Sequence, residues 1–308
     1  MENVGTAMIK RILLPCFFTL TGLCLQGQPS VLPDSLLAHV RELSADRYQG
    51  RRTQEAGNLM AGDYLLIRFQ AMGLRPFDSS FVHPFQFYNR WLKESLTGRN
   101  IVGYVQGTAH PDQYIVLSAH YDHLGVRNDQ IYNGADDNAS GTGALLEIAR
   151  YFSQHPPQHS ILFAAFDAEE LGLQGAASFV DEPPVPLGNI LLDINMDMIS
   201  RNVKNELYIC GTKYTPSFRA PLEKLGENSP ISIVFGHEEP EPRGMDDWTM
   251  SSDHGRFHQK GIPFLYFGVE DHEDYHQPTD DFDRVMPDFY VNAANFILES
   301  LLLLDEKL

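Results

Sequence analysis

The sequence predicts an α/β fold in three layers, with a mostly parallel, mixed central sheet flanked by helices. Short apolar segments that suit buried strands alternate along the chain with segments of helical periodicity. This alternation is typical of a sheet whose two faces are both covered by helices. Neither an internal repeat nor a Ser/Gly linker divides the sequence, so we expect a single domain at residues 28–308.

Two segments near the start of this domain show the apolar spacing of helices. Leu36, Val40 and Leu43 form a stripe within residues 33–47, and a second stripe within residues 56–73 stops at a glycine. The remaining expected helices lie at residues 141–152, 172–179, 215–225 and 286–304. The expected strands, rich in apolar residues, lie at residues 100–105, 114–118, 161–166, 190–195, 207–210 and 263–267.

Charge and cysteine content exclude some classes of function. The formal net charge is −18, and the sequence contains no cluster of Lys and Arg of the kind that a phosphate backbone needs. Nucleic acid is therefore not an expected partner. Beyond residue 27 the sequence has a single cysteine, Cys210. Any bound metal is therefore expected to have histidine and carboxylate ligands instead of a thiolate cluster.

Residues 1–27 have the pattern of a cleaved export signal. Lys10 and Arg11 precede an apolar run at residues 12–25, and small residues near Gly27 suit a cleavage site. The mature chain is therefore expected to be exported, either to a periplasm or out of the cell.

A membrane anchor and a lipid anchor are the alternatives for this segment. The apolar run is short for a span of about 20 residues and contains Pro15, so no stable membrane insertion is expected after the signal is removed. Lipid attachment at Cys24 would leave the chain at a membrane surface. Leu23 is larger than the small residue that precedes the cysteine in bacterial lipoprotein signals, so cleavage is the preferred interpretation.

Histidines and carboxylates follow three of the expected strands. They are His120 and Asp122 after the strand at 114–118, Glu169 and Glu170 after the strand at 161–166, and Asp197 after the strand at 190–195. Polar residues are common at strand ends, so each group alone carries little information. Parallel strands, however, end at one edge of their sheet, where active sites collect. Three such groups in succession predict one site at that edge.

Two further segments add candidate ligands. The run Asn133-Gly134-Ala135-Asp136-Asp137-Asn138-Ala139-Ser140-Gly141 leads into an expected helix, which Asn138 or Ser140 can cap. Capping leaves its two aspartates unexplained. The run Tyr275-His276-Gln277-Pro278-Thr279-Asp280 places a histidine on a turn near the C-terminus.

In order and spacing, the three groups after the strands and these two runs together resemble the zinc aminopeptidases of the M28 peptidase family, over about residues 40–300. The resemblance implies the phosphorylase/hydrolase-like fold of the zinc-dependent exopeptidases.

Carried over residue by residue, the resemblance implies a centre with two zinc ions. Asp136 would bridge the ions, with His120 and Asp197 completing one of them, and Glu170 and His276 the other. Imidazole and carboxylate groups suit Zn²⁺, and a bridging carboxylate holds two ions about 3.5–4 Å apart. The family also has a cis peptide bond at the position that matches Asp136 and Asp137.

Two residues receive catalytic roles. Glu169 stands beside a predicted ligand without being one, so it would take a proton from the attacking water and pass it to the leaving amine. Asp122 is two residues beyond His120 on the same side of an extended segment, where it would accept the free N–H of the imidazole.

Expectations for the surroundings of the site are less specific. Aromatic residues of the C-terminal third are candidates for a pocket that takes the first side chain of a peptide, and acidic residues for a rim that attracts a protonated N-terminus. The pocket candidates are Trp248, Phe257 and Tyr266, and the rim candidates are Asp271, Glu273 and Asp274. His123 and His254 are expected beside the ligands, and His258 and His272 at the surface.

The function inferred from these residues is that of a zinc aminopeptidase acting on peptides. A glutaminyl cyclase of the same fold, working with one zinc ion, is the first alternative; it would carry Trp before the last histidine ligand, where this sequence has Tyr275. The second alternative is an inactive binding domain, which would have lost ligands. All five predicted ligands are present, but the metal centre alone leaves carboxypeptidase and dipeptidase specificities open.

Overall fold

The computed structural model describes residues 1–2, 29–238 and 246–308. Nearly all of the predicted export segment lies outside these ranges. Across the ranges that the structure describes, we find no helix with both the length and the apolar character needed to cross a bilayer.

A mixed eight-stranded sheet runs through the centre of the described residues. Its strand order is β1-β2-β6-β3-β7-β10-β8-β9. The strands are β1 (Val82–Asn89), β2 (Glu94–Val105), β6 (His159–Phe166), β3 (His110–His120), β7 (Ile190–Asp197), β10 (Phe264–Gly268), β8 (Glu206–Cys210) and β9 (Ser232–Phe235). The four middle strands, from β6 to β10, are parallel to one another, whereas β2 and β8 flank them antiparallel. A separate hairpin consists of β4 (Gly125–Arg127) and β5 (Gln130–Tyr132).

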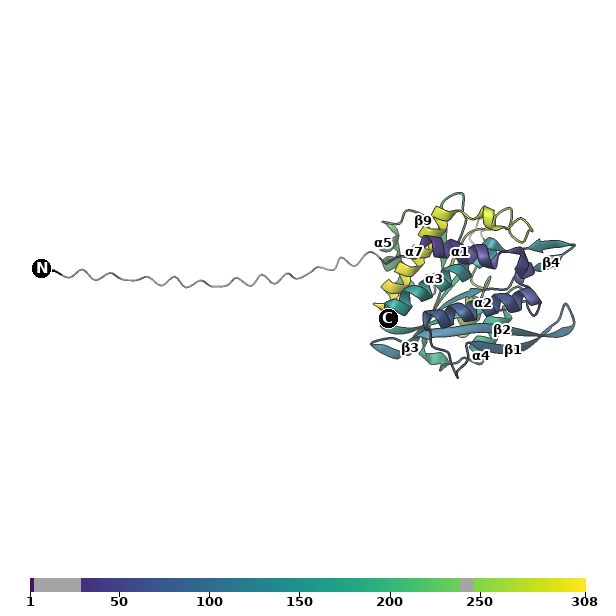
Figure 1. Ribbon diagram of the computed structural model, residues 1–308, viewed down its shortest axis with the longest axis horizontal. Helices are drawn as coiled ribbons and strands as arrows, with labels where there is room; N and C mark the ends of the chain where they lie inside the picture. Colours follow the sequence, from purple (N-terminus) through teal and green to yellow (C-terminus); the bar gives the residue numbers. More distant parts are fainter. Residues whose placement is uncertain (3–28, 239–245) are drawn as a thin grey trace.

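Helices cover both faces of the sheet, which confirms the predicted three-layer fold. On one face, α1 (Pro33–Leu43), α2 (Ala56–Met72), α3 (Gly141–Gln154) and α7 (Pro287–Asp305) lie together, with α5 (Arg219–Gly226) beside α7 (Figure 1). Leu36, Phe69 and Leu145 belong to the large apolar core on this side. On the other face, α4 (Gln174–Asp181) and α6 (His254–Gln259) pack on a second core that contains Phe166 and Phe257.

The elements that the sequence did not predict are short or lie at the edges of the sheet. β1 contains Pro84, which lacks the N–H that a central strand would use, and it pairs with β2 alone as an edge strand. β9 lies at the opposite edge and α6 has only six residues, so neither shows a periodicity long enough to recognise.

A buried carboxylate joins the first helix to the core. Both oxygens of Glu147, in α3, accept hydrogen bonds: Oε1 from Ser35 Oγ at 2.5 Å, and Oε2 from the amide of Leu32 at 3.2 Å and from Arg150 Nε at 2.8 Å. Burial by itself would raise the pKa of Glu147, but these bonds and His39 Nε2 at 3.5 Å outweigh it and lower the pKa to about 2.

We expect Glu147→Gln to destabilise the protein by about 3 kcal/mol at pH 7, because a carboxylate with a lowered pKa contributes its full stabilisation above its ordinary pKa. That contribution disappears as the pH falls from about 4.5 towards 2. Urea unfolding of wild type and variant should therefore show a gap in the free energy of unfolding that closes below pH 4.5. Glu182→Gln, at an exposed position, is the control; an equal gap at all pH values would contradict the assignment.

Candidate metal centre

The parallel strands bring the predicted site residues to one edge of the sheet. His120 is the last residue of β3, Asp197 is the last residue of β7, and Glu169 and Glu170 follow the end of β6. Because β6, β3 and β7 are neighbours with the same direction, these side chains meet although they lie far apart in the sequence. The structure thus brings His120, Glu169, Glu170 and Asp197 together, as the sequence predicts.

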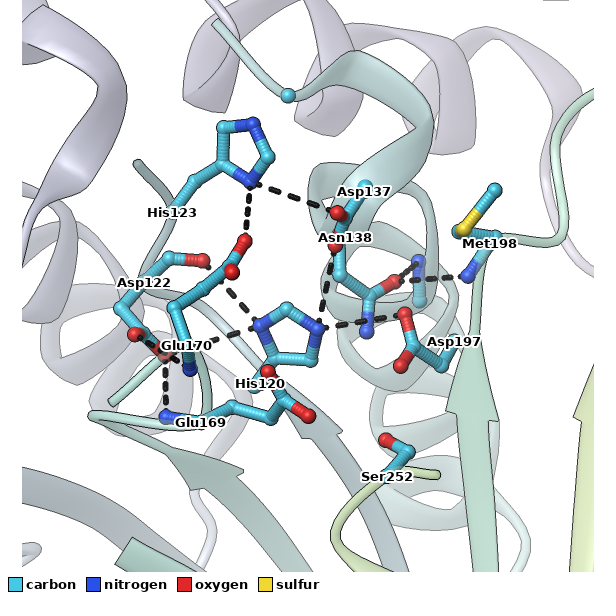
Figure 2. Close-up of polar contacts among 12 residues, drawn as sticks. His120, Asp122, His123, Asp137, Asn138, Glu169, Glu170, Asp197, Met198 and Ser252 are labelled. Atoms are coloured by element: carbon cyan, nitrogen blue, oxygen red, sulfur yellow. Dashed lines mark hydrogen bonds and ion pairs between the residues drawn. The ribbon is translucent and has the colours of Figure 1, made fainter. Parts of the chain in front are cut away.

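The carboxylate at the centre of the cluster belongs to Asp137 and not to Asp136. One oxygen of Asp137, Oδ1, lies 3.3 Å from Nε2 of His120, and the other, Oδ2, lies 3.2 Å from Nε2 of His276. Asp137 therefore faces a histidine on each side, as Figure 2 shows for His120. This is the arrangement expected of a carboxylate shared by two ions.

Asp136 points away from the centre, so the sequence-based choice of Asp136 as the bridging residue is corrected by one position. Its Oδ1 accepts hydrogen bonds from the amide and the hydroxyl of Ser200, both at 2.7 Å, and its Oδ2 lies 3.0 Å from Nε2 of His272. The cis peptide bond is likewise one residue further along than expected, between Asp137 and Asn138. Adjacent residues of a turn direct their side chains differently, and nothing in the chemistry of two neighbouring aspartates reveals which one faces inward.

Hydrogen bonds from other segments hold this turn in place. The carboxylate of Asp280 accepts the amides of Asp136 and Asp137 at 3.0 Å each. Within the turn, the side chain of Asn138 accepts the amide of Gly141, the first residue of α3, at 2.8 Å. Behind the turn, the fully buried Arg51 donates to four backbone carbonyls, those of Leu43, Tyr121, Asn133 and Gly134. Arg51 could not be recognised from the sequence, because its partners are carbonyl groups that no residue pattern marks.

The carboxylate of Asp122 positions the two glutamates. It accepts the amide of Glu169 at Oδ1, at 3.0 Å, and the amide of Glu170 at Oδ2, at 3.3 Å (Figure 2). Nδ1 of His120 lies closer to the backbone carbonyl of Asp122, at 3.2 Å, than to its carboxylate, at 3.6 Å. The predicted contact of Asp122 with the imidazole is thus made mainly by its carbonyl group, and its carboxylate is occupied by the amides that begin the Glu169–Glu170 pair.

Two histidines approach Glu170 from opposite sides. Nε2 of His276, on a turn after β10, lies 3.4 Å from Glu170 Oε2, and the His276 ring stacks on Tyr275. Nδ1 of His123 lies 2.8 Å from Glu170 Oε1 and 3.6 Å from Asp137 Oδ2. His123, which the sequence analysis placed beside the ligands, is therefore in direct contact with two of them.

The two adjacent glutamates have opposite electrostatic surroundings. Burial raises the pKa of Glu169 well above its ordinary value, and the nearby carboxylates of Glu170 and Asp197 reinforce this, whereas His120 opposes it. Burial and Asp137 also act to raise the pKa of Glu170, but His123 and His276 outweigh them and lower it to about 2. A pair of carboxyl groups whose pKa values are pushed apart is typical of sites in which one group binds and the other exchanges a proton.

The residues present fit a zinc centre. The ligands of a tetrahedral zinc ion lie about 3.3 Å from one another, because Zn–N and Zn–O bonds are about 2.0–2.1 Å long. The donor atoms of His120 lie 3.2 Å from Asp197 and 3.3 Å from Asp137, and those of His276 lie 3.2 Å from Asp137 and 3.4 Å from Glu170. The donors also fall into two groups with ligand atoms within 4.8 Å of one another, His120–Glu169–Asp197 and His123–Asp137–Glu170.

Unpartnered buried atoms support the same conclusion. Within the described ranges, Nε2 of His123 lacks a hydrogen-bond partner, and Glu170 Oε1 and His123 Nδ1 face each other at 2.8 Å without hydrogen-bond geometry, although all three atoms are shielded from solvent. Leaving a buried nitrogen such as Nε2 unpaired costs about 1–3 kcal/mol, and several carboxylates crowd the same volume. A cation between them would satisfy these atoms and offset the concentrated negative charge.

A cavity of about 360 Å³ opens over this cluster. Trp248, Tyr266 and Asp271 line it, in agreement with the expectations from the sequence. The other expected pocket and rim residues lie elsewhere, so those expectations are wrong. Phe257 is buried against Phe166 and Phe179, Asp274 is buried in an ion pair with Arg201, and Glu273 lines a neighbouring cavity.

The three other histidines considered from the sequence, His254, His258 and His272, contact residues outside the metal centre. His254 is buried and its Nε2 lies 2.7 Å from the carbonyl oxygen of Trp248, so it supports a wall of the cavity. His258 packs against Tyr214 and Phe264. His272, expected at the surface, instead pairs with Asp136, because the turn directs that aspartate away from the centre.

Comparison with known proteins agrees with this geometry. A family model described as "Peptidase family M28" matches residues 100–301. Aminopeptidase YwaD of Bacillus subtilis (strain 168) is 31% identical over 217 residues, which make up 65% of this chain and 43% of that protein. The chain spans about half the length of the curated relatives it matches.

Solved structures with the same fold include both enzyme classes considered from the sequence. BSAP, described as a zinc aminopeptidase from Bacillus subtilis, superposes with a TM-score of 0.71 at 18% identity, covering 89% of this chain and 96% of that one. The glutaminyl cyclase of Porphyromonas gingivalis superposes with a TM-score of 0.73 at 18% identity, covering 91% and 100% of the two chains. Similarity at this level concerns the fold.

Proposed function

Because the chain belongs to peptidase family M28, we propose that it is a zinc-dependent exopeptidase that removes N-terminal residues from peptides. The observation that carries the proposal is Asp137, whose two carboxylate oxygens each face a different histidine. Similarity to an aminopeptidase of Bacillus subtilis supports the choice of the N-terminal end.

The proposed centre holds two zinc ions per chain. His120, Asp137 and Asp197 would hold one ion, and Asp137, Glu170 and His276 the other, with Asp137 shared. Zinc, when bound, supplies a Lewis acid that polarises the peptide carbonyl and makes a water molecule a better nucleophile at neutral pH.

The residues around the ions would orient the substrate and move the proton. Glu169 lines the cavity, where it would accept a proton from the attacking water and pass it to the leaving amine. Asp122 would keep Glu169 in place, because its carboxylate holds the Glu169 amide at 3.0 Å. The carboxylate of Asp271, on the cavity wall, would attract the protonated N-terminus of a peptide.

We also propose that the enzyme is exported and that its mature form is one domain. Residues 1–27 would direct export and be removed, and residues 28–308 would act as a single metallopeptidase domain. The eight-stranded sheet, whose strands come from both ends of the described chain between β1 and β10, supports one domain. The export part is tested by expressing the whole chain in a bacterial host and finding the N-terminus of the exported protein by mass spectrometry.

The activity is tested by a substrate screen on the purified mature chain, with and without a chelator. The substrates are aminoacyl and dipeptidyl fluorogenic compounds, peptides blocked at either end, and peptides that begin with glutamine. We expect release of single N-terminal residues, complete loss with chelator, recovery on adding zinc, and about two zinc ions per chain by metal analysis. Cyclisation of glutaminyl peptides without hydrolysis would favour the cyclase instead, and the absence of any turnover by zinc-loaded protein would favour a binding domain.

A further inference from the structure

An exposed tryptophan stands at the mouth of the metal cavity. Trp91 lies between β1 and β2, and 86% of its surface is exposed, which is unusual for a side chain with this much apolar area. It lines the same cavity as His120, Glu169 and His276. The strands on either side belong to an edge of the sheet, so Trp91 reaches the site from a part of the chain far from the ligands.

The backbone that carries Trp91 is held in a defined turn. The side-chain oxygen of Asn89 accepts the amides of Trp91 and Leu92, both at 2.9 Å, and the backbone carbonyl of Asn89 accepts the amide of Lys93 at 2.8 Å. Asn89 itself is buried, with 4% of its surface exposed. Three hydrogen bonds to one buried residue therefore position the Trp91 backbone, although its ring is exposed.

Buried apolar residues and the exposed Trp91 both line the metal cavity. The buried ones are Met198, Tyr266 and Val269. Trp91 and Gly172 also line a second cavity of about 270 Å³, together with residues 88–90, Leu171 and Gln174. None of the predicted ligands lines this second cavity, so it adjoins the metal cavity on the side of Trp91.

We propose that Trp91 is a specificity-determining residue that contacts the second residue of the peptide, immediately after the bond that is cleaved, and favours an apolar side chain there. This inference rests on the proposed function. An exopeptidase must bind the terminal residue beside the ligands and let the rest of the peptide leave, so the second residue passes the exposed part of the cavity lining, at Trp91. Together with Leu173 on the same cavity wall, the indole ring offers apolar surface to the first side chain that leaves.

The test compares Trp91→Ala with Tyr88→Ala. Tyr88 is an aromatic residue near the end of β1 with 60% of its surface exposed, and it lines the second cavity but not the metal cavity. Each zinc-loaded enzyme is assayed with Leu-Phe-amide and with Leu-Gly-amide, which differ only at the second residue. For Trp91→Ala we expect kcat/KM to fall about 10-fold on Leu-Phe-amide, mainly through KM, and less than about 2-fold on Leu-Gly-amide.

Tyr88→Ala is expected to behave like the wild type on both peptides, and the zinc content of both variants should be unchanged because neither side chain contacts a ligand. Equal losses on the two peptides, or none, would overturn the role of Trp91 while leaving the peptidase activity established by the wild type. A wild-type enzyme that cleaves neither peptide would overturn the proposed function, and the inference about Trp91 with it.

Discussion

Replacing Asp137 by asparagine is expected to remove at least one of the two zinc ions. A carboxylate offers two ligand oxygens, whereas an amide offers one oxygen and an NH₂ group that does not bind zinc. Asparagine can therefore supply a ligand atom to only one of the two proposed zinc ions. After dialysis against metal-free buffer, we expect the wild type to keep about two zinc ions per chain and Asp137→Asn to keep at most one. The activity should fall at least about 10³-fold, more than the loss of a single electrostatic contact causes. Metal analysis by mass spectrometry and peptide hydrolysis measure the two effects.

Asp136→Asn is the matched control, since it makes the same chemical change at the adjacent residue. Asp136 accepts bonds from Ser200 and His272 and faces away from the ligands. We expect this variant to lose about 1–2 kcal/mol of stability, through the altered contact with His272, and to retain its zinc. Loss of zinc in Asp136→Asn with retention in Asp137→Asn would restore the assignment made from the sequence and refute the one made from the structure.

Replacing Glu169 by glutamine is expected to abolish most catalysis without removing zinc. Glutamine keeps the size of the side chain but cannot accept and return a proton. We expect kcat to fall about 10²–10⁴-fold, the usual contribution of a general acid–base, with little change in KM. The amide of residue 169 that donates to Asp122 is part of the backbone, so it is present in both the wild type and the variant. The backbone that carries residue 169 should therefore be unchanged. Steady-state kinetics and metal analysis of the same preparation separate a catalytic role from a ligand role.

Glu273→Gln provides the control for the loss of one negative charge near the site. Glu273 is exposed and lines a neighbouring cavity outside the metal cavity. Its variant should therefore hydrolyse peptides at the wild-type rate. If Glu169→Gln were as active as Glu273→Gln, Glu169 would not be the base. If Glu169→Gln lost a zinc ion together with its activity, Glu169 would be a ligand.

Much of the fold could be predicted because its central strands contain apolar runs and its main helices have apolar residues at helical spacing. The parallel strands β3, β6 and β7 and the helices α2, α3 and α7 all contain such patterns, and the structure has them within a few residues of the predicted ranges. β1 and α6 were missed because an edge strand with Pro84 and a helix of six residues have no distinctive periodicity.

The sequence by itself determined which chemistry the site has. His120, Glu169, Glu170, Asp197 and His276 are recognisable because their residue types and their order after the strands are properties of the chain, and the structure brings them together. The structure alone decided between the two adjacent aspartates, since the direction of a side chain depends on the backbone path of its turn. Asp280 accepts the amides of Asp136 and Asp137, and Ser200 donates to Asp136; these two residues set that path from segments more than 60 residues away in sequence. The same reason applies to Arg51, whose place behind the turn depends on carbonyl groups of three separate segments.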